Sequence, residues 1–222
     1  MSFSTDWDVT YKSGGHRSRW PWSDLVSLFF RYLRGKDFSK LRVLELGCGA
    51  GANIPFLLSL GVDYHALEGS EHIVNELRER FPEIQSKIKN ADFTKEIPFE
   101  GNFDIIIDRA SLVHNHSEAI THAIELCYGK LEKDGLFIGV DWFSDSHTDL
   151  KRGEAAEDPN TRTKLETGSF VGLGRVHFFS KSELLRTFDK FEALYLEHKK
   201  NDVLIPASDY TVAAWNFIFR KK

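Results

Sequence analysis

The chain has 222 residues, of which 41% are hydrophobic and 28% charged, with a formal net charge of -4. This length suffices for one substantial domain with its own core, and the composition is ordinary for a soluble globular protein. The mild negative charge disfavours nucleic acid as an obligatory partner. The two cysteines, Cys48 and Cys127, have neither disulfide nor metal-ligand spacing, so we expect no metal site and a reducing compartment.

The N-terminus lacks the basic start and apolar core of a signal peptide. No apolar run approaches the length needed to span a membrane. We therefore expect a cytoplasmic protein that does not bind a membrane. The oligomeric state stays open.

Apolar runs of strand length alternate with segments of helical periodicity along most of the chain. The runs predicted as strands are residues 42–46, 64–68, 86–89, 103–108 and 136–141. The helices between and before them are predicted to begin at the N-caps Ser23, Ser70 and Ser117. A turn at residues 133–135 is expected to separate the helix after Ser117 from the last of these strands. Strands that alternate with helices predict a parallel sheet with right-handed crossovers.

Residues 144–179 break this rhythm. They are polar, contain four glycines and one proline, and lack a long apolar run. A loop of this length within a compact domain is usually functional or disordered. A helix after Ser180 and two strands, at residues 191–198 and 213–219, complete the predicted elements.

The most informative stretch runs from Arg42 to Asn53, where an apolar run breaks into alternating glycines. A strand that feeds a glycine loop and then a helix forms the nucleotide crevice of a doubly wound α/β sheet. Glycine lets the backbone turn sharply there and approach a ligand closely. Gly47, Gly49 and Ala52 formally satisfy the G-x-G-x-x-G/A pattern of dinucleotide enzymes, so the glycines alone do not identify the cofactor.

Glu45 separates the alternatives. A carboxylate two residues before the first glycine repels a pyrophosphate, whereas a sulfonium or an ammonium group favours a nearby acid. The stretch Glu45–Gly51 resembles motif I of the class I S-adenosylmethionine-dependent methyltransferases, and the resemblance covers about residues 41–141. It implies S-adenosylmethionine as cofactor and S-adenosylhomocysteine as product. It also implies a Rossmann-like α/β fold with a doubly wound seven-stranded sheet of order 3-2-1-4-5-7-6, the last strand antiparallel.

The resemblance further implies roles for acids after the next strands. Glu68 matches the acid that accepts hydrogen bonds from both ribose hydroxyls. Asp92 matches the acid that accepts from the adenine amino group, and Phe93 the side chain that packs on the ring. Asp108 and Arg109 match motif IV at the mouth of the site. The other positions expected to bind the cofactor are Gly47, Cys48, Gly49, Gly51, Asn53, Gly69 and Ser70.

We expect a single domain over residues 1–222. Its parts would be an N-terminal lid and helix at 1–35, a cofactor-binding core at 41–141, a substrate-side insert at 144–179, and a C-terminal helix and strands at 180–222.

The N-terminal segment combines glycines with aromatic and arginine side chains, which offer movement, stacking and carboxylate pairing. It resembles the lids of several small-molecule methyltransferases. Tyr11 or Arg19 would then touch the methionine carboxylate of the cofactor. The alternative is that Trp20 and Trp22 pack as plugs against the first helix.

Methyl transfer needs an acceptor held in line with the methyl group, and a general base only if a proton must leave early. His114 is the first candidate base, because imidazole titrates near neutral pH; it could instead simply line the wall. Asp141 could orient the acceptor, with the aromatic residues after it forming a pocket wall, or it could merely end a strand. Arg175 and His177 could face an anionic acceptor, although solvation at the surface is the stronger expectation.

The leading prediction is methyl transfer to a small-molecule acceptor, such as a metabolite or sugar intermediate. Protein or peptide methylation, a non-catalytic cofactor-binding module and a dinucleotide oxidoreductase remain alternatives. The segment Asp108–Ser111 lacks the proline and aromatic residue of the D/N-P-P-Y/F motif, so methylation of base amines in DNA is not expected.

Overall fold

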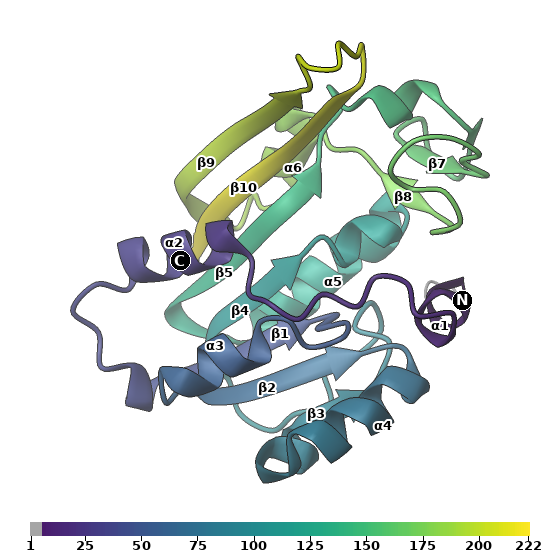
Figure 1. Ribbon diagram of the computed structural model, residues 1–222. Coiled ribbons are helices and arrows are strands. Elements are labelled where there is room, and N and C mark those ends of the chain that lie inside the picture. The colour runs from purple at the N-terminus through teal and green to yellow at the C-terminus, as the bar shows by residue number, and fades with distance from the viewer. Residues whose placement is uncertain (1–5) are drawn as a thin grey trace.

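The computed structural model describes residues 6–222, and its centre is a seven-stranded sheet of order β3-β2-β1-β4-β5-β10-β9 (Figure 1). The first five strands are parallel, and β10 is antiparallel to both β5 and β9. The predicted fold and strand order are confirmed. The strands are β1 Arg42–Leu46, β2 Asp63–Glu68, β3 Ile88–Asn90, β4 Phe103–Arg109, β5 Leu131–Phe143, β9 Phe191–Asp202 and β10 Thr211–Lys221.

Helices cover both faces of this sheet. The α-helices are α1 Asp6–Lys12, α2 Ser23–Tyr32, α3 Ile54–Ser59, α4 Glu71–Arg80, α5 Ser117–Lys130 and α6 Lys181–Thr187. The short 3-10 helices are η1 Phe38–Lys40, η2 Pro82–Lys87, η3 Leu112–His114 and η4 Thr148–Lys151. One apolar core joins the sheet to α2, α3 and α4, and a second joins it to α5 and α6 (Figure 1).

Strand β1 explains why its sequence is a continuous apolar run. Val43 belongs to the core under α2–α4, whereas Leu44 and Leu46 belong to the core under α5 and α6. A parallel strand with helices on both faces buries both sets of its side chains. The glycine loop therefore follows directly after a strand that is packed on both faces.

The insert is more ordered than the predicted long loop. Three short strands, β6 Glu154–Ala155, β7 Thr161–Thr163 and β8 Val176–His177, form an antiparallel sheet. Five buried apolar residues give it a small core of its own: Leu165, Phe170, Leu173, Val176 and Phe178. These residues are mostly scattered singly, so no apolar run marks the core in the sequence. In Figure 1 the insert and α1 both lie beyond the carboxyl ends of the central strands.

Two predicted N-caps are wrong by one residue. Helix α2 begins at Ser23 itself, and α5 begins at Ser117. The side chain of His116 accepts the capping hydrogen bond of α5 from Ala119 N at 3.4 Å. The predicted cap Ser70 is confirmed, because its hydroxyl accepts a hydrogen bond from the first turn of α4.

Strand β5 starts earlier than predicted. The turn expected at residues 133–135 is instead a bulge inside the strand, with Asp134 at a φ of +61°. In the register with β4 the partners jump from Leu131 to Leu136. An extra stretch of this kind bends a strand without ending it. Leu131, which precedes the predicted turn, therefore belongs to the sheet.

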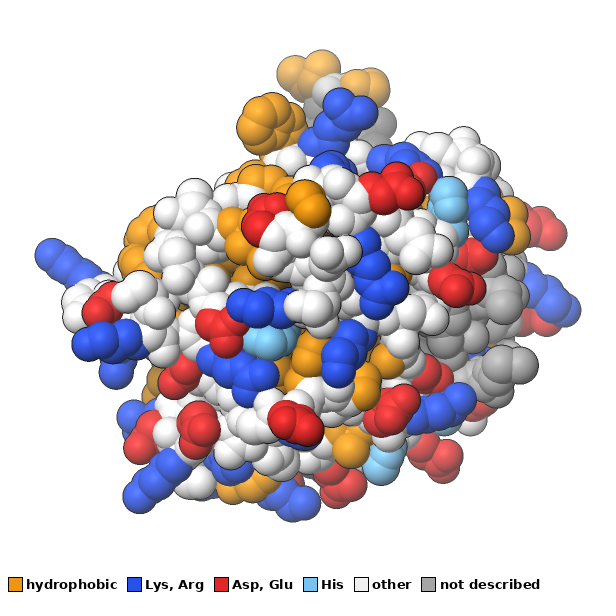
Figure 2. All heavy atoms as spheres, turned by 90° about the horizontal axis from the view of Figure 1, so that it is seen from below, with side chains coloured by type: hydrophobic (Ala, Val, Ile, Leu, Met, Phe, Trp, Pro, Cys, Tyr) orange, Lys and Arg blue, Asp and Glu red, His pale blue; other side chains and the backbone are white. Residues whose placement is uncertain are grey.

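The outer surface carries mixed charge on the face seen in Figure 2, where basic and acidic side chains are interspersed. Within the described residues, the structure contains no helix that combines the length and apolarity needed to cross a membrane.

Candidate functional site

A cavity of about 370 Å³ opens where the central parallel strands end. The glycine loop after β1, the N-terminal segment and the insert all contribute to its wall. Pockets that bind small molecules usually measure about 300–1,000 Å³, and they lie at this edge of open α/β sheets. The cavity therefore has the place and the size of a small-molecule site.

The glycine loop is built for close approach. Gly47, Gly49 and Gly51 have φ values of +59°, +51° and +77°, a region that side chains disfavour. A Cβ atom at Gly47 would overlap the side chain of Ser111, and one at Gly49 would lie 3.1 Å from the Tyr11 hydroxyl. The first two glycines line the cavity, so their missing side chains leave backbone exposed to a ligand.

Glu45 is buried beside this loop and ties it to its surroundings. Its carboxylate accepts hydrogen bonds from Asn53 Nδ2 at 2.7 Å and from the Tyr64 hydroxyl at 2.6 Å. Asn53 Oδ1 in turn accepts from Trp22 N at 3.3 Å. Burial raises the pKa of Glu45 to about 7, although both side-chain hydrogen bonds favour its ionised form. A cation in the cavity would stabilise that form further.

Glu68 closes the other side of the loop. One carboxylate oxygen accepts from Gly49 N and the other from Ser70 N, both at 2.9 Å. Burial raises the pKa of Glu68, whereas these backbone N–H groups lower it. Each oxygen keeps a further lone pair, because a carboxylate oxygen can accept two hydrogen bonds. The hydroxyl of Ser70 donates to Asp8, which fastens α1 to the start of α4.

Two further predicted acids support loops. Asp108 is buried, and its carboxylate accepts from Trp142 Nε1 at 2.6 Å and from Leu112 N at 3.0 Å. Burial raises its pKa to about 6, against the effect of these hydrogen bonds. Asp92 accepts from Thr94 N at 3.0 Å and so holds the turn after β3. Its predicted contact with adenine stays a prediction.

Arg109 joins the strands to the N-terminal segment. Its guanidinium lies 2.9 Å from the carboxylate of Asp141 and 3.5 Å from the ring centre of Trp22. Asp141, predicted to orient the acceptor, is held by this pair and by Lys199 at 3.7 Å. Trp20 is 83% exposed, so the alternative of two tryptophan plugs is wrong for this residue.

The N-terminal segment contacts both ends of the cavity. Tyr11 is buried over the glycine loop, and Trp7 meets the ring of His114 edge-on with centroids 4.7 Å apart. Arg17 donates to Tyr11 O at 2.9 Å and pairs with Glu76 at 2.7 Å. Figure 1 shows the chain after α1 crossing the sheet to reach α2. These contacts would hold the N-terminal segment over the cavity. That the segment acts as a lid stays a prediction.

His114 is buried in the cavity wall in a fixed tautomer. Its Nδ1 lies 3.0 Å from Arg175 O. A carbonyl oxygen only accepts, so Nδ1 carries the proton and Nε2 keeps a free lone pair. Burial lowers the pKa of His114 to about 4, which keeps the ring neutral at neutral pH.

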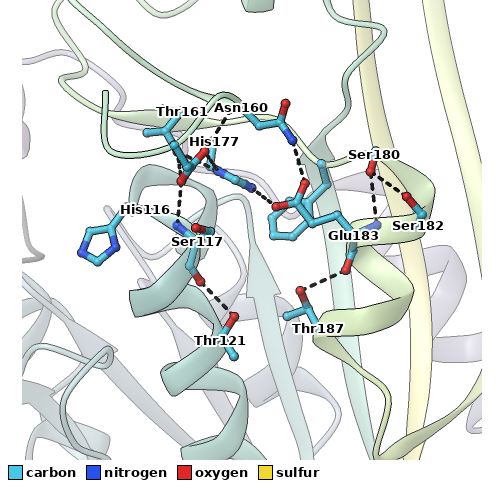
Figure 3. A network of polar contacts seen from close by, with 12 residues as sticks. His116, Ser117, Thr121, Asn160, Thr161, His177, Ser180, Ser182, Glu183 and Thr187 are labelled. Atoms are coloured by element: carbon cyan, nitrogen blue, oxygen red, sulfur yellow. Dashed lines mark hydrogen bonds and ion pairs between the residues drawn. The ribbon is translucent and has the colours of Figure 1, made fainter. Parts of the chain in front are cut away.

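The insert is anchored by a second buried histidine, His177 (Figure 3). Thr161 donates its hydroxyl proton to Asp158 at 2.7 Å and lies 2.7 Å from His177 Nδ1, which must therefore be the donor. His177 Nε2 lies 3.2 Å from Glu183. Both ring nitrogens thus carry protons, and the imidazolium lies between two carboxylates, with Nδ1 3.4 Å from Asp158 and Nε2 3.2 Å from Glu183. Although burial alone would lower it, these carboxylates raise the pKa of His177.

This network joins the insert to the domain. Asp158 also accepts from Ser117 N at the start of α5, and Glu183 lies on α6. The expectation that His177 is solvated is therefore wrong. Arg175 pairs with Glu157, so its guanidinium is engaged inside the insert.

Most predicted site residues line the cavity. Those on its wall are Tyr11, Glu45, Gly47, Cys48, Gly49, Asn53, Glu68, Phe93, Arg109 and His114. Those that do not line it, all within the described part of the chain, are Arg19, Gly51, Gly69, Ser70, Asp92, Asp108 and Asp141.

Four wall residues inside the insert were not predicted from the sequence, namely His147, Ser169, Phe170 and Leu173. The one available signal was the group of phenylalanines near residues 170–179, set in an otherwise polar stretch. The predicted aromatic wall is represented by Phe143, which does line the cavity.

Residues 43–135 match the family model described as a methyltransferase domain. No match was found among curated protein sequences.

Solved structures share the fold over most of the chain. A SAM-dependent methyltransferase from Methanosarcina mazei is 16% identical, with a TM-score of 0.68 over 87% of this chain and 96% of that one. The CcbJ methyltransferase from Streptomyces caelestis is 18% identical, with a TM-score of 0.64 over 90% and 94%. Magnesium protoporphyrin IX methyltransferase from Synechocystis, with bound SAM, is 12% identical, with a TM-score of 0.57 over 89% and 78%.

Proposed function

We propose that the chain is a class I S-adenosylmethionine-dependent methyltransferase and that it methylates a small molecule bound between the glycine loop and the insert. The observation that carries the proposal is one continuous cavity. Gly47 and Glu68 line one end, and Phe143 and Phe170 line the other. A donor and an acceptor bound at these ends would meet without crossing solvent.

The residues around the glycine loop fit a cationic ligand that carries hydroxyl groups. Glu68 has lone pairs left for two ribose hydroxyls after accepting its two backbone N–H groups. A pyrophosphate would instead face the buried carboxylates of Glu45 and Glu68. This donor set favours S-adenosylmethionine over a dinucleotide. The neighbouring structures with bound SAM and SAH support the same choice.

The shape of the cavity supports a small acceptor over a protein. The insert is fastened to α5 and α6 by the buried His177 network, so it covers the acceptor end with ordered structure (Figure 3). A cavity of about 370 Å³ cannot admit a folded surface and accommodates only a small group. A peptide side chain inserted from outside is the second candidate.

When bound, S-adenosylmethionine supplies a methyl carbon on a good leaving group, so the protein has mainly to position the acceptor and exclude water. The insert and Trp22 would shield the reacting atoms. His114 Nε2 has the lone pair to accept a hydrogen bond from an O–H or N–H nucleophile. Because the pKa of His114 is about 4, it would orient the nucleophile and take little of its proton before the methyl group moves.

Calorimetry with S-adenosylhomocysteine and with NAD tests the cofactor. We expect saturable binding of the first and none of the second; the reverse result would refute the proposal. Incubation of a cell extract with methyl-labelled S-adenosylmethionine tests the acceptor class. Label in the small-molecule fraction supports the proposal, and label confined to protein supports the second candidate.

A further inference from the structure

The acceptor end of the cavity contains a buried donor that the proposed mechanism does not use. His147 is 1% exposed and lines the cavity. Its Nδ1 accepts a hydrogen bond from Asp149 N at 3.1 Å. In a neutral imidazole whose Nδ1 accepts, the proton resides on Nε2. That Nε2–H has no hydrogen-bond partner among the described residues and is itself buried, so an acceptor that enters the cavity reaches it only by displacing part of the wall.

The surroundings keep this ring neutral and in place. Burial lowers the pKa of His147, so a second ring proton is disfavoured. Asp149 lies two residues after His147, in η4. Its buried carboxylate accepts from Ser169 N at 2.9 Å and from the Tyr210 hydroxyl at 2.7 Å. A Cβ atom at Gly168 would overlap that carboxylate, so the turn beside it needs glycine. The donor is therefore pre-positioned by contacts that reach across the insert and to Tyr210, directly before the start of β10.

The walls around His147 are aromatic and apolar. Its ring centre lies 4.9 Å from that of Phe170, and Phe170 lies 4.3 Å from Phe143. Leu173 and Val212 add apolar surface, and Ser169 is a polar residue of the insert that also lines the cavity. Such a wall suits a flat unsaturated molecule and gives a sugar few partners for its hydroxyl groups.

Native proteins rarely leave a buried N–H unpaired, and a ligand is one reason for an exception. We propose that the methyl acceptor is a flat aromatic molecule whose ring nitrogen or carbonyl oxygen accepts a hydrogen bond from His147 Nε2. The inference rests on the proposed function and specifies the substrate class of the same site. His147 then selects and orients the acceptor, while His114 meets the nucleophilic atom.

Two probe molecules of the same shape test this contact. Quinoline carries a ring nitrogen that accepts hydrogen bonds, whereas naphthalene has no hydrogen-bond acceptor of this kind. The variant His147→Asn keeps an oxygen that can accept from Asp149 N but loses the Nε2 donor. The variant His147→Gln keeps an N–H donor near the position of Nε2. The exposed His122 gives His122→Asn as a matched control.

Affinities are measured by ligand-observed NMR on protein saturated with S-adenosylhomocysteine. We expect His147→Asn to lower the affinity for quinoline about tenfold, which is the upper range for one hydrogen bond. The affinity for naphthalene should not change. His147→Gln should keep quinoline binding within about threefold of the wild type. The Nε2–H resonance of His147 should shift with quinoline and not with naphthalene. His122→Asn should change neither affinity.

Three results would overturn the inference. They are an equal loss of both probes in His147→Asn, no change of quinoline affinity in that variant, or a wild type that binds S-adenosylhomocysteine but neither probe. If His147→Asn does not fold, the resonance shift in the wild type and the quinoline affinity of His147→Gln decide instead. Failure of the wild type to bind S-adenosylhomocysteine contradicts the proposed function and is therefore a separate outcome.

Discussion

At the glycine-loop end of the cavity the polar groups hold one another in place. Glu45 accepts from Asn53 and Tyr64, and Glu68 accepts from two backbone amides. At the insert end the wall consists of aromatic rings, and His147 keeps a donor without a partner in the described structure. The first end presents a fixed carboxylate pattern to any ligand, whereas the second presents shape and one directional contact.

The two ends also differ in how the chain assembles them. The loop end is formed mainly by residues 45–68, which follow one another through β1, α3 and β2. The insert end brings together His147, Phe170 and Val212, which are far apart in the sequence. We therefore expect local backbone changes to damage the loop end most, and loss of long-range anchors to damage the insert end most.

The largest effect is expected for Gly47→Ala. Its φ of +59° strains any side chain, and the added Cβ overlaps Ser111. Strain and overpacking together should lower the free energy of unfolding by about 2–5 kcal/mol. Binding of S-adenosylhomocysteine should be lost. Urea denaturation and calorimetry measure the two effects.

Gly61→Ala is the control for this change. Gly61 has a φ of +76°, but no described atom lies within 4 Å of the added Cβ. Gly61→Ala should lower the free energy of unfolding only by the backbone strain, about 1–2 kcal/mol, and should leave the binding of S-adenosylhomocysteine unchanged. Equal losses at the two glycines would contradict a special requirement for close approach at Gly47.

Glu68→Ala should lower the free energy of unfolding less than Gly47→Ala does, and its main effect should be on the affinity for S-adenosylhomocysteine. It removes the carboxylate proposed to bind two hydroxyl groups, and charge-assisted hydrogen bonds contribute about 1.5–3 kcal/mol each. We expect the affinity for S-adenosylhomocysteine to fall at least about a hundredfold, as measured by calorimetry. Quinoline binding at the insert end should not change.

The exposed Glu71 gives Glu71→Ala as a control, because it lies three residues further on with its side chain in solvent. Its affinity should equal that of the wild type. A Glu68→Ala protein that still binds tightly would remove this residue from the ribose site. A matching loss of quinoline would mean that the two ends are not separable.

The loop end could be predicted because its signals are local. The bounds of β1 follow from one apolar run, and Glu45, Gly47 and Glu68 occupy positions that a short motif specifies. The strand order came from the resemblance, since the alternation of strands and helices alone gives only a parallel sheet.

The insert end could not be predicted, because the function of its residues depends on contacts that the sequence does not display. His147 is notable only once Asp149, Phe170 and the buried environment are known. Asp141 illustrates the converse. It ends a strand at the correct edge of the sheet, but Arg109, on the neighbouring strand, engages its carboxylate.

A smaller effect is expected from pH at the insert end. The carboxylates of Asp158 and Glu183 raise the pKa of His177 above its ordinary 6.5, although burial opposes them. This stabilisation is complete below the unfolded pKa and is lost as the pH rises through the folded one. We expect the free energy of unfolding to decrease on going from acidic to alkaline buffer, because the imidazolium loses its proton and with it the attraction of the two carboxylates.

Urea denaturation at a series of pH values measures this loss. His177→Gln should be less stable than the wild type below neutral pH and should lack the alkaline decrease, whereas His122→Gln should behave as the wild type. A decrease of the same size in His177→Gln would show that other groups cause it. Quinoline binding should weaken with the wild-type stability, and S-adenosylhomocysteine binding should weaken less.

The smallest effect is expected at Trp22, which lines the cavity. Its ring packs on Arg109 with 3.5 Å between guanidinium and ring centre, a contact worth about 0.5–2 kcal/mol. Trp22→Leu should lower the affinity for S-adenosylhomocysteine about threefold, which corresponds to the lower part of that energy range. It should also reduce the protection that the ligand gives against trypsin near Gly14. Trp20→Leu, at a residue that is 83% exposed, should change neither property. If S-adenosylhomocysteine leaves cleavage near Gly14 unchanged in the wild type, the N-terminal segment is a fixed wall shared by both ends and not a lid.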